Sequence, residues 1–219
     1  MRTLAILPIK SFNHAKQRLE PELNPGPRRA LAEAMFSDVL VALRRATAVD
    51  EMLVVTTDNA AQQIAGGHGA MVLDDREAGH NAAAALGIEQ ASESGFERVL
   101  LVPGDCPALD PHELDALIRR TVSSPSVLIV PDRHGTGTNA LLLTPPDALA
   151  PAFGPGSCAR HATAARAAGI DAEVVDVPSL GHDVDTPEDL AALQELLAAR
   201  HGGAAHTRGM LNQLLRSQG

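Results

Sequence analysis

RVLLVPGD, residues 98–105, is the stretch of sequence that decides the fold. Its unbroken apolar run predicts a strand buried on both faces, as in parallel sheets that are covered by helices on both sides. Comparable runs alternate with helix-periodic segments along most of the chain. This alternation predicts a single α/β domain over residues 1–200, Rossmann-like, with a mostly parallel central sheet flanked by helices.

The positions of the other elements follow from apolar periodicity and from helix start and stop signals. We expect strands at residues 3–9, 52–57, 70–75, 98–105, 126–131, 139–145 and 172–177. We expect helices at residues 28–46, 81–94, 111–123, 158–168 and 187–200, and a short one that ends at Gly66-Gly67. Residues 201–219 differ in composition and are expected to form a mobile C-terminal tail, with docking of MLNQLL as a short helix as the alternative.

The composition excludes several classes of protein. The 219 residues include no Trp, no Tyr and four Phe, and the net charge is -9. Few aromatic rings and an acidic surface both argue against a nucleic-acid partner. Cys106 and Cys158 show neither metal-ligand spacing nor a disulfide framework. No secretory signal or membrane span is visible, so we expect a cytoplasmic protein with no membrane partner. A homodimer stays open.

Two aspartates distant in sequence are the first candidates for chemistry. Asp105 follows a predicted strand, and Asp185 precedes a Thr-Pro-Glu-Asp helix start. Ligands bind at the carboxyl ends of strands in such sheets, so we expect both carboxylates to meet there, at the ends of neighbouring strands. Carboxylate oxygens suit Mg²⁺, and the pair therefore predicts a metal site, with Asp183 as a less secure third member. The plainer alternatives are a turn aspartate at 105 and helix capping around Thr186.

Basic residues follow the first predicted strand. Lys10, Lys16 and Arg18 lie in the segment LPIKSFNHAKQRL, at the edge of the sheet where ligands are expected. In an acidic protein this placement favours a clamp for a triphosphate, in which lysine acts as a point charge and arginine binds two oxygens. Ordinary solvated loop charges are the alternative.

Three further loops are expected at the same edge. Asn81 stands at a helix start, where its amide could read a base or a ribose. The glycine-rich segment RHGTGTNALLL carries Thr138 and Asn139, and FGPGS carries Gly154 and Ser157 ahead of a helix. Backbone N–H groups in such loops can hold an anion, although a flexible hairpin explains the first loop equally well. The nine histidines lack zinc-ligand spacing and are expected to be solvated or to lie behind the site.

The ordered motifs LPIK…AKQRL, TTD, GHNAAAALG, VPGDCPAL, GTGTNALLL, FGPGS and DVDTPEDL resemble one enzyme family. These are the 2-phospho-L-lactate or phosphoenolpyruvate guanylyltransferases of coenzyme F-420 biosynthesis, within the MobA-like nucleotidyltransferases. The resemblance covers residues 3–198; DVDTPEDL is common to the wider group, and GTGTNALLL followed by FGPGS points to this family. It implies transfer of GMP from GTP to phosphoenolpyruvate or 2-phospho-L-lactate, with release of pyrophosphate. A related acid such as 3-phosphoglycerate stays open.

Residue roles follow from the resemblance by position. It implies that Asp105 and Asp185 hold Mg²⁺ and that Lys16 contacts the triphosphate of GTP. It also implies that three residues lie around the acid substrate, namely Thr138, Gly154 and Ser157.

Two rival functions remain at this stage. Pro8, Ile9 and Lys10 stand where MobA-like enzymes have a glycine-rich loop, so phosphate contacts at these positions stay open. One alternative function is that of another nucleotidyltransferase of this fold, acting on a molybdopterin or a sugar phosphate, although the short GTGTN and FGPGS loops leave little room for a large acceptor. The other is a non-catalytic nucleotide-binding protein, which the intact Lys16 and the aspartates disfavour.

Overall fold

The computed structural model describes residues 1–20, 23–75, 79–120 and 123–217, and its centre is a seven-stranded sheet. The strand order is β3-β2-β1-β4-β6-β5-β7. β6 pairs antiparallel with β4 and β5, and the other pairings are parallel, which confirms the predicted mostly parallel sheet. The strands are β1 Thr3–Pro8, β2 Glu51–Val55, β3 Met71–Leu73, β4 Arg98–Leu101, β5 Ser126–Pro131, β6 Thr138–Thr144 and β7 Asp171–Val174.

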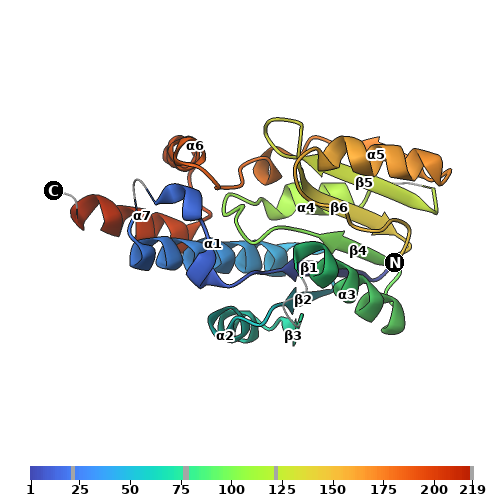
Figure 1. Ribbon diagram of the computed structural model, residues 1–219, viewed down its shortest axis with the longest axis horizontal. Helices are drawn as coiled ribbons and strands as arrows, with labels where there is room; N and C mark the ends of the chain where they lie inside the picture. The colour runs from blue at the N-terminus through green and yellow to red at the C-terminus, as the bar shows by residue number, and fades with distance from the viewer. Residues whose placement is uncertain (21–22, 76–78, 121–122, 218–219) are drawn as a thin grey trace.

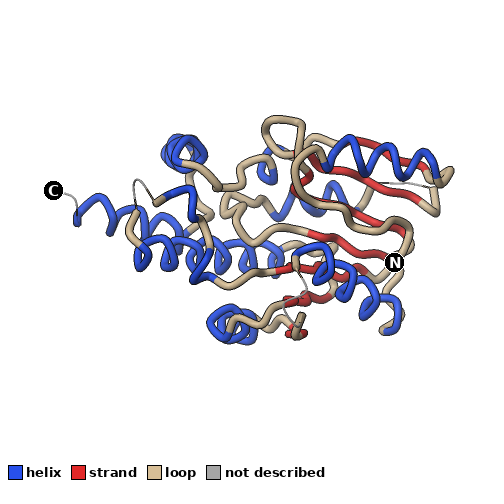
Figure 2. The backbone as a smooth tube through the Cα atoms, in the orientation of Figure 1, coloured by secondary structure: helices blue, strands red, loops and turns tan. Residues whose placement is uncertain are grey.

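Helices cover both faces of this sheet (Figures 1 and 2). The α-helices are α1 Pro25–Arg45, α2 Asn59–Gly67, α3 His80–Glu93, α4 Pro111–Ile118, α5 Ser157–Ala167, α6 Pro187–Ala199 and α7 Ala205–Ser217. Short 3-10 turns are η1 Phe12–His14, η2 Gln17–Leu19 and η3 Pro178–Leu180. None of the described helices combines the length and the apolar character that a bilayer crossing requires.

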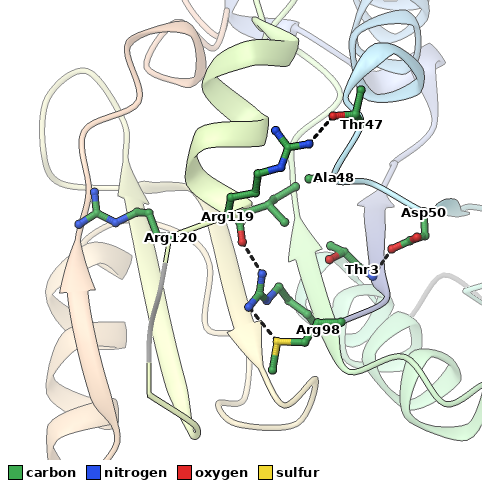
Figure 3. A pocket seen from close by; sticks show the side chains of 9 residues that line it. Thr3, Thr47, Ala48, Asp50, Arg98, Arg119 and Arg120 are labelled. Carbon is green, nitrogen blue, oxygen red and sulfur yellow. Dashed lines mark hydrogen bonds between the residues drawn. The ribbon is translucent and has the colours of Figure 1, made fainter.

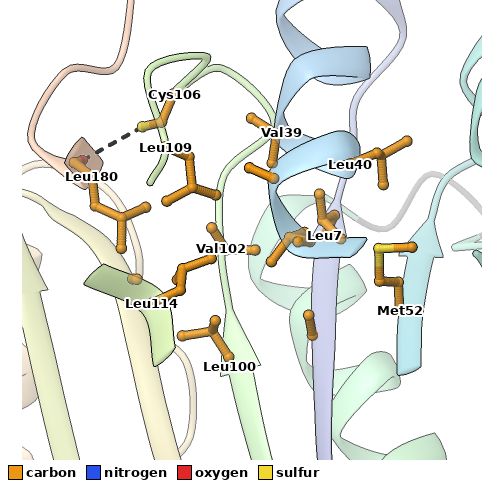
Figure 4. Close-up of a cluster of buried hydrophobic side chains, with 14 of the residues drawn as sticks. Leu7, Val39, Leu40, Met52, Leu100, Val102, Cys106, Leu109, Leu114 and Leu180 are labelled. Atoms are coloured by element: carbon orange, nitrogen blue, oxygen red, sulfur yellow. Dashed lines mark hydrogen bonds between the residues drawn. The ribbon is translucent and has the colours of Figure 1, made fainter. Parts of the chain in front are cut away.

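Side-chain alternation along the strands assigns the helices to their faces. In β1, Ala5 and Leu7 point to the face covered by α1, α2 and α4, whereas Leu4 and Ile6 point to the face covered by α3 and α5. Figure 4 shows the first of these layers, with Leu7 and Leu100 beneath Val39 of α1. Because both faces are covered, the central strands consist of continuous apolar residues, as the sequence pattern indicated.

Several elements end earlier than predicted. The strand expected at 98–105 ends at Leu101, since Pro103 has no N–H group with which to extend the ladder. The strand expected at 172–177 is β7, which ends at Val174. The helix expected at 111–123 ends at Ile118, and residues 121–122 of that prediction lie outside the described residues.

The segment expected as a C-terminal tail contains α7, which lies along α1 (Figure 1). Of the two alternatives, the structure therefore has the docked helix, and it is longer than MLNQLL. Leu211 packs in a third apolar cluster with Leu31 and Met35 of α1. The carboxylate of Asp38 in α1 accepts hydrogen bonds from the backbone N–H of His206 at 3.1 Å and of Thr207 at 2.7 Å. These are N–H groups of the first turn of α7, which the helix itself cannot satisfy.

Replacement of Asp38 tests this docking. Asp38→Ala should lower the free energy of unfolding by about 0.5 to 2 kcal/mol, the usual cost of losing a side-chain cap at a helix N-terminus. Urea denaturation monitored by circular dichroism measures the change. Glu195→Ala, which removes an exposed carboxylate of α6, is the matched control and should change stability much less. Equal stability of the two variants would contradict the capping role.

Candidate active site

Lys16 joins Asp105 and Asp185 in one cluster. Its Nζ donates hydrogen bonds to Asp105 Oδ2 and, at 3.0 Å, to Asp185 Oδ1. The Lys16 side chain is 8% exposed, compared with 26% for Asp105 and 53% for Asp185. Burial alone would lower the pKa of Lys16, but the two carboxylates raise that pKa above its ordinary value. Lys16 is therefore a charged ammonium held between two carboxylates.

The prediction that the two aspartates end neighbouring strands was wrong. Asp105 lies in the loop after β4, as expected. Asp185 lies in the loop between η3 and α6, whereas β7, the preceding strand, ends at Val174 on the edge of the sheet. The chain returns from that edge to the centre because Val184 is completely buried in the cluster formed with α6 and α1. The carboxylates meet through this return of the chain and not through strand pairing.

Lys16 adopts an unusual backbone conformation. It lies between η1 and η2 in the left-handed region, with φ of 56° and ψ of 36°. This conformation costs a non-glycine residue about 1 kcal/mol or more, so surrounding contacts must hold it. The ion pairs supply contacts at one end, and the loop is fixed at its start by Asp58, which accepts hydrogen bonds from Ser11 Oγ and Phe12 N, both at 3.0 Å.

Asp183 is a third carboxylate beside the pair. Its Oδ1 accepts a hydrogen bond from Asn139 Nδ2 at 3.0 Å, and the same amide donates to Leu180 O at 2.6 Å. Burial, followed by the charge of Asp105, raises the pKa of Asp183 to about 6. Asn139, which the sequence placed in a loop able to bind the anionic substrate, thus holds the third carboxylate in place.

Two observations bear on a metal at this cluster. Asp105 Oδ1 is buried and accepts no hydrogen bond from the described residues. Among those residues, no group of three or more His, Cys, Asp or Glu side chains is arranged to hold a metal ion. A cation would therefore bind to the pair Asp105 and Asp185 with water or substrate oxygens completing its shell. Mg²⁺ commonly binds to one or two carboxylates in this way, so the residues fit that ion.

The cluster opens into a cleft of about 370 Å³ at the carboxyl ends of the central strands. Lys10 and His80 line this cleft together with Lys16, Asp105 and Asp185. Burial, followed by the charge of Lys10, lowers the pKa of His80, which favours its neutral form. Arg18 is exposed on η2 and is not among the residues that line the cleft. Its proposed contact with the triphosphate stays a prediction.

Another cavity, of about 480 Å³, lies at the opposite ends of the strands (Figure 3). Thr3 and Arg98, the first residues of β1 and β4, line it. Its polar groups largely satisfy one another: Arg98 donates to Thr144 Oγ1 and Ile118 O, and Arg119 donates to Thr47 Oγ1. Because ligands of such sheets bind at the carboxyl ends, the smaller cleft is the better candidate site.

The predicted acid-contacting residues gather at the start of α5. Ser157 is the first residue of this helix, and its Oγ is buried without a hydrogen-bond partner among the described residues. Gly154 has φ of +121°, a conformation that favours glycine. Thr138 Oγ1 lies 3.0 Å from His161 Nδ1. The hydroxyl of Ser157 is therefore available as a donor to an anion. The first two N–H groups of α5 are already engaged, because Ser157 N donates to Gly154 O and Cys158 N donates to Thr136 O.

His161 is buried and lies within hydrogen-bonding distance of both Thr138 and the loop before α5. Its Nε2 accepts a hydrogen bond from the backbone N–H of Ala152 at 2.9 Å, so we infer that Nδ1 carries the proton and donates to Thr138 Oγ1. Burial, followed by the charge of Arg160, lowers the pKa of His161 to about 4. Sequence reasoning placed histidines behind the site only in general; nothing in the sequence singles out His161, whose partners lie in two other loops.

Asn81 stands at the start of α3, as expected, and both atoms of its side-chain amide bind to the backbone of Phe153. Its Oδ1 accepts a hydrogen bond from Phe153 N at 2.8 Å, and its Nδ2 donates to Phe153 O at 3.2 Å. His80, its neighbour, lines the cleft and was not predicted as a site residue. The sequence feature that could have identified His80 as a site residue is its position at the same helix start as Asn81.

The comparisons with known proteins identify the family. The sequence profile described as "Guanylyl transferase CofC like" matches residues 3–217. The chain belongs to this family. It is 57% identical to the phosphoenolpyruvate guanylyltransferase of Conexibacter woesei over 219 residues, which is 99% of this chain and 98% of that protein. It is 36% identical to the 2-phospho-L-lactate guanylyltransferase of Methanothermobacter thermautotrophicus, over 98% of this chain and 92% of that protein. A 3-phospho-D-glycerate guanylyltransferase from Colwellia psychrerythraea is 35% identical over 88% of this chain and 91% of its own length.

Solved structures agree with the fold. A structure from Desulfovibrio desulfuricans G20 matches with a TM-score of 0.77 at 16% identity, covering 99% of this chain and 98% of that one. A nucleotidyl transferase from Methanothermobacter matches with a TM-score of 0.67 at 17% identity, covering 91% of this chain and 99% of that one. These matches confirm a nucleotidyltransferase-like fold.

The buried, neutral His161 predicts a pH dependence of stability. With its pKa lowered from 6.5 to about 4, the unfolded chain binds a proton in this interval that the native protein does not bind. Stability conferred by the neutral ring is therefore lost as the pH falls through that window. His161→Gln cannot titrate, so its unfolding free energy should fall by about 2 to 3 kcal/mol less than that of the wild type between these pH values. Denaturation at several pH values measures this difference. The same pH dependence of the unfolding free energy in the two proteins would contradict a buried, neutral His161.

Proposed function

We propose that this protein transfers GMP from GTP to the phosphate of a small three-carbon acid, with release of pyrophosphate, in coenzyme F-420 biosynthesis. Phosphoenolpyruvate is the favoured acid, because the relative with 57% identity over nearly the whole chain is named for that substrate. The observation that carries the proposal is the cluster of Lys16, Asp105 and Asp185 at the carboxyl-end cleft.

In this proposal Asp105 and Asp185 hold Mg²⁺, consistent with the unpartnered Asp105 Oδ1. When bound, the ion neutralises charge on the α-phosphate and the leaving pyrophosphate. Lys16 and Lys10 provide positive charge at the same cleft, where the triphosphate would otherwise meet only the carboxylates of Asp105 and Asp185. Asn139 restrains the third carboxylate, Asp183, through its amide. Arg18 is an outer triphosphate contact.

The acceptor acid binds at the start of α5. Thr138 accepts the Nδ1–H of His161, which leaves the threonine hydroxyl proton free to donate to an acceptor oxygen. Ser157 Oγ provides a further donor, and Gly154 lets the chain approach the ligand. The attacking phosphate oxygen is already anionic near pH 7, so no general base is needed. Catalysis is alignment plus charge neutralisation.

The alternatives receive less support. The relatives do not support an acceptor as large as a molybdopterin or a sugar phosphate, because these relatives are named for three-carbon acids. A non-catalytic nucleotide-binding protein would have no need of Lys16 held between the carboxylates of Asp105 and Asp185. Phosphoenolpyruvate, 2-phospho-L-lactate and 3-phosphoglycerate remain to be compared directly.

An assay of GTP with each of the three acids tests the proposal. Pyrophosphate release should depend on the acid, be fastest with phosphoenolpyruvate, and yield a product whose mass equals GMP joined to the acid. Asp105→Asn and Asp185→Asn should each lower kcat about a hundredfold or more while the thermal midpoint shows a folded protein. Asp147→Asn, at an exposed carboxylate outside the cleft, is the control. Wild-type rates in either active-site variant would refute the assigned roles.

Metal removal is a separate test. Because the two carboxylates and the triphosphate are all negatively charged, the proposed reaction needs a cation between them. Dialysis against a chelator should therefore reduce turnover to background, and added Mg²⁺ should restore it. Ca²⁺, which prefers more ligands and longer bonds, should restore it poorly. Full activity in the metal-free protein would exclude the metal from the reaction.

A further inference from the structure

Side chains from two helices bind the backbone of the loop of residues 150–156, which precedes α5. Arg160 of α5 donates to Ala152 O and Pro155 O. His161 of α5 accepts the N–H of Ala152. Asn81 of α3 binds both polar groups of the Phe153 backbone, accepting from its N–H at 2.8 Å and donating to its carbonyl at 3.2 Å. The amide of Asn81 therefore pairs with this loop as a neighbouring strand would.

Ring contacts reinforce the same junction. The ring of Phe153 lies edge-to-face between His80, at 5.3 Å between ring centroids, and His161, at 5.4 Å. Such arrangements are attractive between ring faces and ring edges. The loop is thus clamped between α3 and α5, and one wall of the clamp, His80, also lines the cleft that contains Asp105. We call Asn81, His80, Phe153 and His161 the loop clamp.

This geometry bears on what Asn81 does. An amide oxygen and an amide nitrogen that are both engaged by one backbone are poorly placed to read a guanine or a ribose. The loop that they hold leads within one residue to Gly154 and then to Ser157, where the acid is proposed to bind. Displacement of Phe153 would shift those two residues relative to the carboxylate cluster.

We propose that Asn81 is a positioning residue for the acid substrate, acting through the backbone of Phe153, and not a contact of the nucleotide. This inference rests on the proposed function. The inference predicts that a change at Asn81 alters KM for the acid and not KM for GTP, since GTP would bind to the cleft while the acid depends on the loop of residues 150–156. Alignment of the acid with the α-phosphate is a large part of the rate in reactions of this type.

Steady-state kinetics of Asn81→Ala give the first readout. Loss of two hydrogen bonds should raise KM for phosphoenolpyruvate about tenfold and leave KM for GTP within about twofold of the wild type. Phe153→Leu keeps the backbone bonds and removes the ring, so it should show a smaller effect in the same direction. Asn59→Ala, at the exposed first residue of α2, is the matched control and should leave both constants unchanged.

Hydrogen exchange gives a second readout that needs no activity. The amide of Phe153 should exchange faster in Asn81→Ala than in the wild type, with the thermal midpoint and the exchange of the central strands little changed. A rise in KM for GTP alone, an equal rise in both constants, or unchanged exchange at Phe153 would each overturn the inference. If the wild-type protein transfers GMP to none of the acids, the proposed function fails, and the exchange experiment still decides whether Asn81 holds the loop.

Discussion

The ion pairs of Lys16 with Asp105 and Asp185 are the constraint on which the site depends. They join three segments that are 89 and 169 residues apart in sequence. A buried ammonium without these carboxylates would lose its charge, and two neighbouring carboxylates without a cation would repel each other. The left-handed backbone at Lys16 is explained by the same contacts. The arrangement of charges therefore fixes where the N-terminal loop, the loop after β4 and the loop before α6 meet.

Much of the fold could be predicted from the sequence because its signals are local. Apolar runs such as residues 98–101 identify strands wherever both faces of a sheet are covered. The reversal of β6 follows from its short connection to β5, since a parallel neighbour needs a long crossover. The choice between a mobile tail and a docked α7 could not be made from the sequence, because the cap of α7, Asp38, lies more than a hundred residues earlier in the chain. No local pattern reports such a contact.

The site was predictable in residue type more than in geometry. Lys16, Asp105 and Asp185 were identified from their charge and from their place at expected loop starts, and the structure brings them together. The route of Asp185 was not predictable, because the burial of Val184 that returns it to the centre depends on α1 and α6. The pairing of Asn81 with Phe153 was not predictable for a similar reason. Asn81 binds the backbone of Phe153, and any residue type at position 153 would offer the same backbone groups. Resemblance to a family supplied the substrates, which the residues alone did not.

The charged cleft and the loop of residues 150–156, which is proposed to bind the acid, are joined by the contact between His80 and Phe153. A crystal structure with Mg²⁺ and a non-hydrolysable GTP analogue is the most direct test of the central claim. The account predicts Mg²⁺ bound by Asp105 and Asp185 at about 2.1 Å, with the triphosphate in the cleft beside Lys10 and Lys16. Binding of the nucleotide at the opposite ends of the strands, in the cavity lined by Arg98, would contradict it.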